Sequence, residues 1–275
     1  ADQQFPEDKS GGQKELSKIA QHIAVNGKGI LAADESVGTM GNHLQRIKVE
    51  NRKENHWQFR EMLLTVDNSI TQSIRGVIIF HETLYQGKLF RNILKVKGTV
   101  VGIKLDQGLL LLQEQRNHHS RAPWYKKDGA DFGKWHAMLR FAKEGPSNLA
   151  IQENTYTLGC YASICQENGL IPIVEPEVNT EHCQYFTGRV LVAVYKALND
   201  NPVYLEGTLL KPNMVAGHAC TKKNTPEQVA MATVTALHWT VPAAVPWRIK
   251  QNEKGRKEQN GTESIKAINV CPLGK

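Results

Sequence analysis

Lysine and carboxylate side chains recur in this sequence at the ends of short apolar runs. In chain order they are Asp34 with Glu35, His81 with Glu82, Lys104 with Asp106, Lys134, Glu175 with Glu177, and Lys211. An uncharged lysine attacks a ketone, and neighbouring carboxyl groups can carry the protons that this reaction moves. Lysines opposed to carboxylates therefore indicate amine catalysis on a carbonyl substrate. Charged residues also gather at strand ends because the chain meets solvent there, which is the structural alternative for each of them.

Lys211 is the candidate nucleophile. It follows the stretch Thr-Leu-Leu and precedes Pro212, an apolar setting of the kind in which enzymes keep an attacking lysine uncharged. The candidate cationic neighbours are Lys134 and Lys104, and the candidate proton carriers are Glu175, Glu177 and Asp34. Glu175 and Glu177 flank Pro176 and point to the same side of an extended segment, which favours a shared site for the two carboxylates.

The elements that carry these residues alternate along the chain. Strand-length apolar runs occupy residues 29–33, 77–80, 100–103, 170–174 and 204–210, with a shorter run at 131–134. Helical patterns lie between them, at residues 16–23, 147–168 and 190–198 and after the capping sequence Thr-Pro-Glu-Gln at 225–228. This alternation predicts a parallel α/β fold, whose strands deliver side chains to one shared mouth. A doubly wound sheet also binds ligands there, so the pattern favours an enzyme more strongly than it favours a barrel.

The composition predicts one domain over residues 1–275, with residues 246–275 as a divergent and poorly ordered tail. The net charge of +7 fits phosphorylated ligands, and a nucleic-acid partner is not expected because no basic block is interleaved with aromatic residues. The uncharged stretch 229–247 contains two prolines and a histidine, so we expect a buried helix and a turn and no membrane span. The five cysteines lack CxxC spacing, so we expect neither disulfides nor a metal site. Free cysteines fit a protein of the reducing cytoplasm.

Residues 203–213, Val-Tyr-Leu-Glu-Gly-Thr-Leu-Leu-Lys-Pro-Asn, resemble the imine-forming signature of class I fructose-bisphosphate aldolases. Further matches are Gly-Lys-Gly-Ile-Leu-Ala-Ala-Asp-Glu-Ser at 27–36, Phe-His-Glu-Thr-Leu-Tyr at 80–85, Val-Gly-Ile-Lys-Leu-Asp at 101–106 and Ile-Val-Glu-Pro-Glu at 173–177. Residues 36–42 and 87–94 are most similar to liver-type members. The resemblance implies a (β/α)8 barrel of the triosephosphate isomerase type.

By this resemblance Lys211 forms an imine with dihydroxyacetone phosphate, Glu175 transfers protons, and Asp34 handles the proton of the C4 hydroxyl. Lys134 and Glu177 complete the catalytic set. The implied substrate-binding residues are Ser36, Thr39, His43, His56, Lys104 and His136. The implied reaction is reversible cleavage of fructose 1,6-bisphosphate or fructose 1-phosphate. It needs no metal or cofactor, because the protonated imine is itself the electron sink. A cytoplasmic homotetramer is the implied assembly.

The chain departs from the family pattern at the phosphate-binding mouth and at its end. His43, His56 and His136 stand at positions of family arginines, and a histidine near neutral pH is the weaker phosphate ligand. Residues 246–264 are too polar for a buried seventh strand, so strands seven and eight are not recognisable and a six-stranded, incomplete barrel is expected. The alternative function is a catalytically inactive aldolase-like scaffold that contacts acidic partners.

Overall fold

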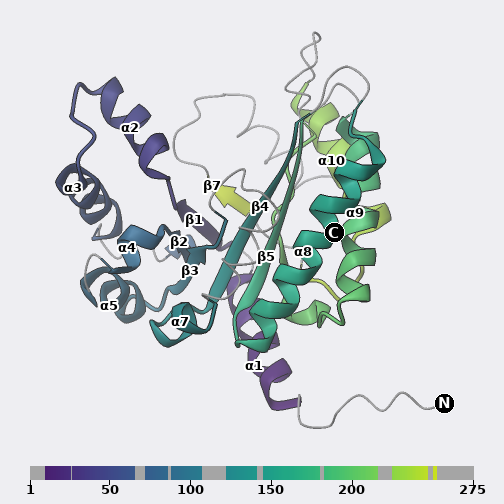
Figure 1. The fold of residues 1–275 in the computed structure, drawn as a ribbon, viewed down its shortest axis with the longest axis horizontal. Helices are drawn as coiled ribbons and strands as arrows, with labels where there is room; N and C mark the ends of the chain where they lie inside the picture. Colours follow the sequence, from purple (N-terminus) through teal and green to yellow (C-terminus); the bar gives the residue numbers. More distant parts are fainter. Residues whose placement is uncertain are drawn as a thin grey trace.

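The computed structural model describes residues 10–25, 27–65, 72–85, 88–106, 122–140, 145–179, 183–215, 225–246 and 250–252. Its strands are β1 Gly29–Ala33, β2 Ile74–Ile79, β3 Val100–Lys104, β4 Phe132–Arg140, β5 Ile171–Asn179, β6 Leu209–Leu210 and β7 Lys250–Asn252. They form one parallel sheet in the order β6-β5-β4-β3-β2-β1-β7 (Figure 1). The first six strands follow one another in space as in sequence, which is the strand order of a (β/α) barrel.

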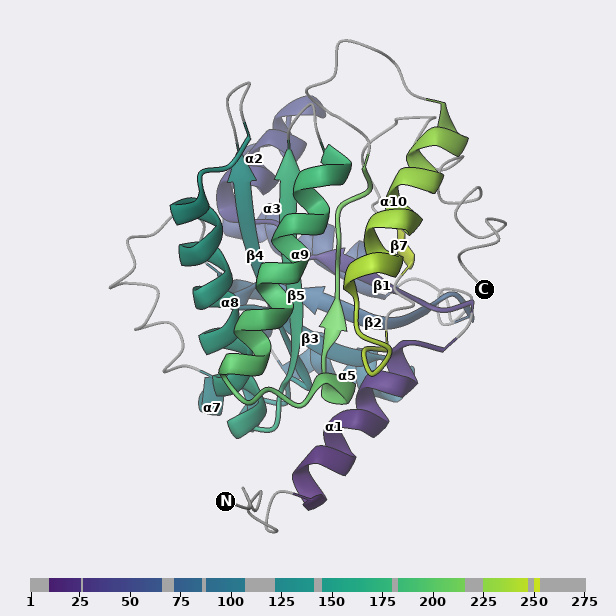
Figure 2. The same cartoon turned by 90° about the vertical axis from the view of Figure 1, so that its right-hand side faces the viewer.

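The helices lie around this sheet and connect its strands. They are α1 Ser10–Ile23, α2 Val37–Arg46, α3 Lys53–Leu64, α4 His81–Tyr85, α5 Lys88–Val96, α7 Ala122–Lys127, α8 Asn148–Glu167, α9 Cys183–Asp200 and α10 Pro226–Thr240. Figure 2 shows α8 and α9 in front of β4 and β5, with α10 beside them. No helix in the described part of the chain combines the length and hydrophobicity that a bilayer crossing requires.

The predicted helix starts at 147 and 225 are confirmed by their caps. The Ser147 side chain accepts a hydrogen bond from the backbone of Ala150, and Thr225 forms a reciprocal capping box with Gln228. Pro226 occupies the first helical position, where its missing N–H costs nothing. Local chemistry alone therefore fixes where α8 and α10 begin.

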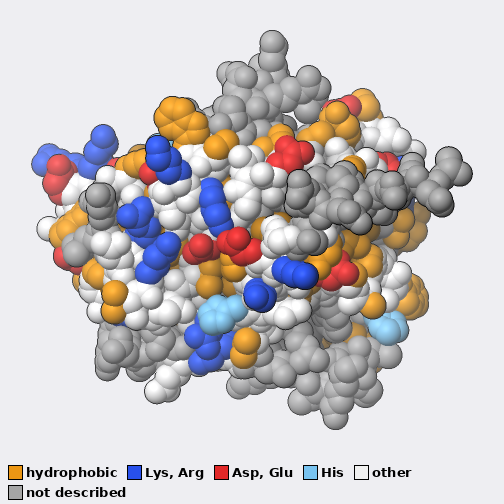
Figure 3. All heavy atoms as spheres, turned by 90° about the horizontal axis from the view of Figure 1, so that it is seen from below, with side chains coloured by type: hydrophobic (Ala, Val, Ile, Leu, Met, Phe, Trp, Pro, Cys, Tyr) orange, Lys and Arg blue, Asp and Glu red, His pale blue; other side chains and the backbone are white. Residues whose placement is uncertain are grey.

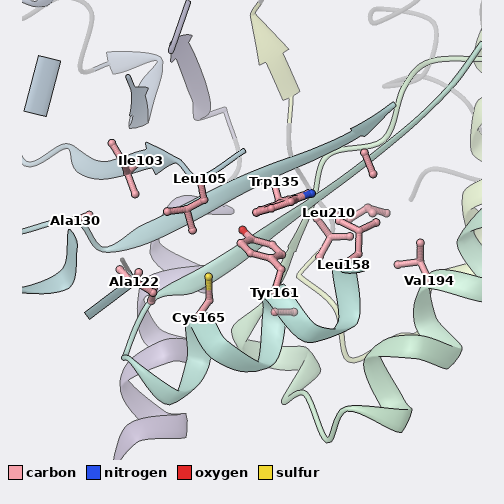
Figure 4. Packing of buried hydrophobic residues seen from close by; sticks show 14 of the residues in the cluster. Ile103, Leu105, Ala122, Ala130, Trp135, Leu158, Tyr161, Cys165, Val194 and Leu210 are labelled. Carbon is pink, nitrogen blue, oxygen red and sulfur yellow. The ribbon is translucent and has the colours of Figure 1, made fainter. Parts of the chain in front are cut away.

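Two core layers follow from the alternation of side chains along the strands. The outer layer, between sheet and helices, includes Ile103, Leu105, Trp135, Leu210 and, from α8, Tyr161 (Figure 4). The inner layer lies on the opposite face of the sheet, where α1 packs across it. It consists of Leu16, Ala20, Ile23, Ile30, Ile78, Phe132, Ile171, Ile173 and Leu209. The inner face of the sheet is thus filled by apolar side chains at the N-terminal half of its strands.

Gly102 is needed at this inner layer because β3 and β4 are neighbours there. A Cβ atom at Gly102 would lie 1.9 Å from the nearest ring atom of Phe132, so the ring takes the space that any other residue would fill. The large Phe132 ring therefore fills the inner layer opposite the one position of β3 that carries no side chain.

Strand β6 is shorter than the predicted run 204–210. Residues Leu205–Gly207 form a 3-10 turn, and only Leu209–Leu210 pair with β5. The Gln166 side chain of α8 accepts a hydrogen bond from the backbone N–H of Tyr204 and donates to the carbonyls of Tyr204 and Gly207. These backbone groups are satisfied by a side chain, so they do not join the sheet.

The expectation of a six-stranded sheet without a strand after residue 246 is wrong in one respect. Residues Lys250–Asn252 form β7, which pairs in parallel with Gly29, Ile30 and Leu31 of β1. A strand at the sheet edge does not have to be apolar on both faces, so the polarity of this stretch did not exclude pairing. Within the described residues the sheet ends at β6 and β7, so the barrel is incomplete, as predicted, and open between those two strands. The rest of the predicted tail lies outside the described residues.

Candidate active site

The candidate site stands directly above the inner core layer. Leu209, Ile173 and Phe132 belong to that layer, and Lys211, Glu175 and Lys134 are each two residues further along the same strand direction. Because side chains alternate across a strand, residues two apart share a face. The strand ends therefore place two lysines and a carboxylate on the inner face, next to an apolar floor.

A continuous chain of ion pairs joins four buried residues. Nζ of Lys211 contacts Oε1 of Glu175, and Nζ of Lys134 lies 3.0 Å from Oε2 of the same carboxylate. Nζ of Lys134 also donates to Oδ2 of Asp34 at 3.0 Å. The contact between Lys134 and Oε2 of Glu175 is an ion pair without hydrogen-bond geometry, so this oxygen keeps a lone pair for another donor. All four residues are less than a tenth exposed.

Burial and charge oppose each other at this cluster. Burial alone raises the pKa of Asp34, but the charge and hydrogen bond of Lys134, with help from Lys104 and Lys211, bring that pKa below its ordinary value. Burial lowers the pKa of Lys134, whereas Asp34 and Glu175 raise it, and the net effect is upward. Asp34 is therefore held as a carboxylate and Lys134 as a cation.

A second pair lies one step further along β4 and β5. Nε2 of His136 lies 2.7 Å from Oε2 of Glu177, and the backbone N–H of His136 donates to Oδ2 of Asp106. Lys104 sits beside the same Asp106, with 3.7 Å between Nζ and Oδ1. The structure thus brings Glu177, His136 and Lys104 to the same strand ends as the buried cluster.

Ser36 and Thr39 begin α2, immediately after Asp34. Oγ of Ser36 accepts a hydrogen bond from the backbone N–H of Thr39 and lies 3.0 Å from its hydroxyl. His43 is half-buried on the same helix. The first turn of α2 is therefore placed next to the cluster, and Ser36 also has a structural role as the helix cap.

His56 is not brought to the cluster as a substrate ligand. It is 1% exposed, its Nδ1 lies 3.2 Å from Oε2 of Glu82, and its Nε2 lies 2.6 Å from Oδ1 of Asn51. Both ring nitrogens are thus engaged within this network, and the structure does not bring His56 together with Lys211, Glu175, Lys134 and Asp34. Its binding role was implied by its place at a family arginine position, which carries no information about burial.

The sequence interpretation missed Arg60. This guanidinium has no exposed surface, donates to Oε2 of Glu82 at 2.9 Å and donates to the carbonyl oxygen of Glu35 at 3.1 Å. The available signal was a lone arginine on the inner side of α3 with two strand-end glutamates to pair with. A single arginine in an amphipathic helix is usually solvated, so the pattern gave no reason to select it.

This arrangement supports proton transfer next to an amine nucleophile. Glu175 touches both lysines, so it can exchange a proton with Lys211 while Lys134 stabilises its negative charge. Asp34, on the other side of Lys134, is an ionised base held in place by that ammonium group. Among the described residues, no group of three His, Cys, Asp or Glu side chains is placed to hold a metal ion.

Comparisons with known proteins agree with this chemistry. A family model described as glycolytic class I fructose-bisphosphate aldolase matches residues 15–275. The chain is 67% identical to fructose-bisphosphate aldolase B of Oryctolagus cuniculus, over 96% of this chain and 78% of that protein. It is 65% identical to fructose-bisphosphate aldolase B of Homo sapiens, over 98% of this chain and 80% of that protein. The expected similarity to liver-type members is confirmed.

A solved structure extends the agreement to the fold. The fructose-bisphosphate aldolase of Plasmodium falciparum superposes with a TM-score of 0.84 at 38% identity, and the match covers 98% of this chain and 82% of that chain. The strand order, the buried lysines and carboxylates, and these matches over nearly the whole chain all lead to one assignment. The chain belongs to the class I fructose-bisphosphate aldolases.

Proposed function

We propose that this chain cleaves fructose 1,6-bisphosphate, and also fructose 1-phosphate, through an imine on Lys211. The observation that carries the proposal is the buried contact between Nζ of Lys211 and Glu175, in a cluster that continues through Lys134 to Asp34. A water-filled surface site could not hold an amine and a carboxylate in this way without competition from solvent. This buried contact supports the proposal, because the imine chemistry needs an amine next to a proton carrier.

The proposed steps use these groups in sequence. Glu175 takes a proton from Lys211, the neutral amine attacks the substrate ketone, and Glu175 returns the proton to the carbinolamine oxygen, which leaves as water. Asp34 then takes the proton of the C4 hydroxyl, the C3–C4 bond breaks, and its electron pair moves to the protonated imine to give an enamine. The aldehyde departs, and protonated Asp34 gives its proton to C3 of the enamine. Water then adds to the imine carbon and passes a proton to Glu175, and departure of dihydroxyacetone phosphate restores the amine. Lys134 stays protonated and orients both carboxylates.

The phosphate and hydroxyl contacts are assigned to the residues around the cluster. We propose that Lys104 and the first turn of α2, with Ser36 and Thr39, take one phosphate, since both lie at the strand ends beside Asp34. We assign the rim position to His136, oriented by Glu177, and to His43. A histidine gives a weaker phosphate contact than an arginine at neutral pH, so we expect a raised KM for the bisphosphate with the imine chemistry intact.

We further propose that the described elements and residues 246–275 form one domain, and that the protein acts as a cytoplasmic homotetramer, as is typical of the family. Sedimentation of the purified chain tests the tetramer directly. A monomer at assay concentration would limit this part of the proposal without affecting the chemistry at Lys211.

Borohydride trapping tests the proposed function most directly. Reduction in the presence of dihydroxyacetone phosphate converts an imine to a stable secondary amine, which peptide mass spectrometry locates. We expect the adduct on Lys211 and none in the Lys211→Arg variant, which keeps the positive charge but cannot form the imine. A folded protein that carries no adduct on Lys211, and cleaves no substrate, would instead favour the inactive scaffold that contacts acidic partners.

A further inference from the structure

A polar network built around two buried side chains, His56 and Arg60, lies outside the cluster and ends one residue from it. It contains Asn51, His56, Glu82, Arg60 and the carbonyl of Glu35, joined by contacts of 2.6 to 3.2 Å. Burying a guanidinium without exposed surface is costly, and it is tolerated only where strong partners are fixed in place. Because this burial is costly, we infer that the positions it imposes on the partners of Arg60 serve the function of the site.

Arg60 joins three parts of the chain through its two terminal nitrogens. It projects from α3, its Nη1 binds Glu82 just beyond the end of β2, and its Nη2 binds the Glu35 carbonyl just beyond the end of β1. The planar guanidinium makes these two contacts in fixed directions, which a lysine with one nitrogen cannot reproduce. Arg60 therefore sets the position of the Glu35 peptide relative to the end of β2.

A second contact, from His56, also orients the Glu82 carboxylate. Its Oε2 accepts from Arg60 and also lies 3.2 Å from Nδ1 of His56, whose other nitrogen contacts Asn51. Burial alone raises the pKa of Glu82, but hydrogen bonds from Arg60 and His56 lower it overall, so the carboxylate stays charged. Two donors therefore hold the Glu82 carboxylate in place, and Arg60 extends the network to the Glu35 carbonyl.

We propose that Arg60 is a positioning residue for Asp34. The Glu35 carbonyl that Arg60 binds is adjacent in the chain to Asp34, whose Oδ2 must meet Nζ of Lys134 at 3.0 Å. A shift of the Glu35 peptide moves Asp34 relative to the reacting substrate while leaving Lys211 and Glu175, on β6 and β5, where they are. This inference rests on the proposed function. It predicts that loss of Arg60 impairs cleavage of the carbon–carbon bond and leaves imine formation on Lys211 intact.

The Arg60→Lys variant tests this separation. We expect kcat for cleavage of fructose 1,6-bisphosphate to fall on the order of 10- to 100-fold, with a smaller change in KM, because misplacement of a reacting group by about 1 Å has effects of that size. Borohydride trapping of dihydroxyacetone phosphate on Lys211 should persist. The matched control is Arg189→Lys, an exposed arginine of α9 that binds Asn148, which should leave kcat unchanged.

A second variant guards against loss of folding. Glu82→Gln keeps an oxygen acceptor for Arg60 and removes only the charge, so we expect it to fold and to lower kcat less than Arg60→Lys does. An unchanged kcat in folded Arg60→Lys or Glu82→Gln, or an equal loss of trapping and cleavage, would overturn the positioning role.

A crystal structure of Arg60→Lys makes the test independent of activity. We expect Oδ2 of Asp34 to have left hydrogen-bond distance of Lys134 in the variant and to remain within it in the wild type. If the wild type neither traps nor cleaves substrate but the displacement occurs, the proposed function fails and the positioning role stands. If Asp34 keeps its place in the variant, the positioning role fails whatever the activity.

Discussion

Two sectors of the sheet differ in how firmly their strands are paired. Strands β4 and β5 align over nine residue pairs, from Phe132 with Ile171 to Arg140 with Asn179, and α8 packs on both. At the edges of the described sheet, β1 and β7 share three pairs and β5 and β6 share two. Lys134 and Glu175 lie in the firmly paired sector, and Lys211 follows β6, where its backbone N–H donates to the carbonyl of Val174. Asp34 follows β1 in the weakly paired sector, and Lys134 holds it from across the interior.

Loss of the amine should have the largest effect. Replacing Lys211 with Met removes the imine-forming group. We expect kcat/KM to fall on the order of 10⁴-fold or more, because the remaining residues of the site cannot carry out the reaction without the nucleophile. Circular dichroism should show an intact fold, because Met fills a similar volume. Substantial cleavage by Lys211→Met would place the chemistry elsewhere in the sheet.

Loss of Lys134 should remove the ion pairs that join the two sectors of the sheet. Lys134→Met leaves Asp34 and Glu175 buried without their shared cation, which we expect to lower the free energy of unfolding by about 3–5 kcal/mol. The control is Lys196→Met, which breaks an exposed ion pair with Asp200 at an expected cost of about 0.3–0.5 kcal/mol. Urea unfolding measures both. Equal costs would show that the buried pairs contribute no more than the exposed one.

The lowered pKa of Asp34 predicts an acid-sensitive link between the sectors. The folded-state pKa lies below the ordinary value near 3.8, so the stabilisation by Asp34 is present above that value and lost as the pH falls through the folded-state pKa. The stability difference between wild type and Asp34→Asn should therefore shrink on acidification below about pH 4. Urea unfolding at a series of pH values measures it, and a constant difference would contradict the ionised state assigned to Asp34.

The smallest effect is expected at β7. Gln251→Pro removes one backbone donor from a three-residue edge strand, so we expect a loss within about 1 kcal/mol and a melting shift of roughly 2–4 °C. The same change at Ile173, which is paired on both sides by Lys134 and Leu209, should prevent folded protein from accumulating. Similar losses of stability at the two positions would mean that edge strand β7 stabilises the fold as much as central strand β5 does.

The local parts of this structure were predictable, and the long-range parts only in outline. An apolar run located β1, and capping chemistry located α8 and α10, because both signals act between neighbours in sequence. Two-residue alternation predicted a shared side for Glu175 and Glu177. The burial of His56 and Arg60 did not follow, because it depends on Glu82 and Asn51 meeting α3 in space. The pairing of β7 was missed because an edge strand lacks the hydrophobic pattern of a central one.

The contact between Lys134 and Asp34 joins residues 100 positions apart in the chain. Contacts between such distant positions close large loops, and chains rich in them fold slowly. The contact between Asp34 and Lys134 can form only after β4 has been synthesised and has docked on the sheet. We therefore expect it to be among the last contacts to form, so that recovery of activity after denaturation would report completed folding more stringently than recovery of helix content.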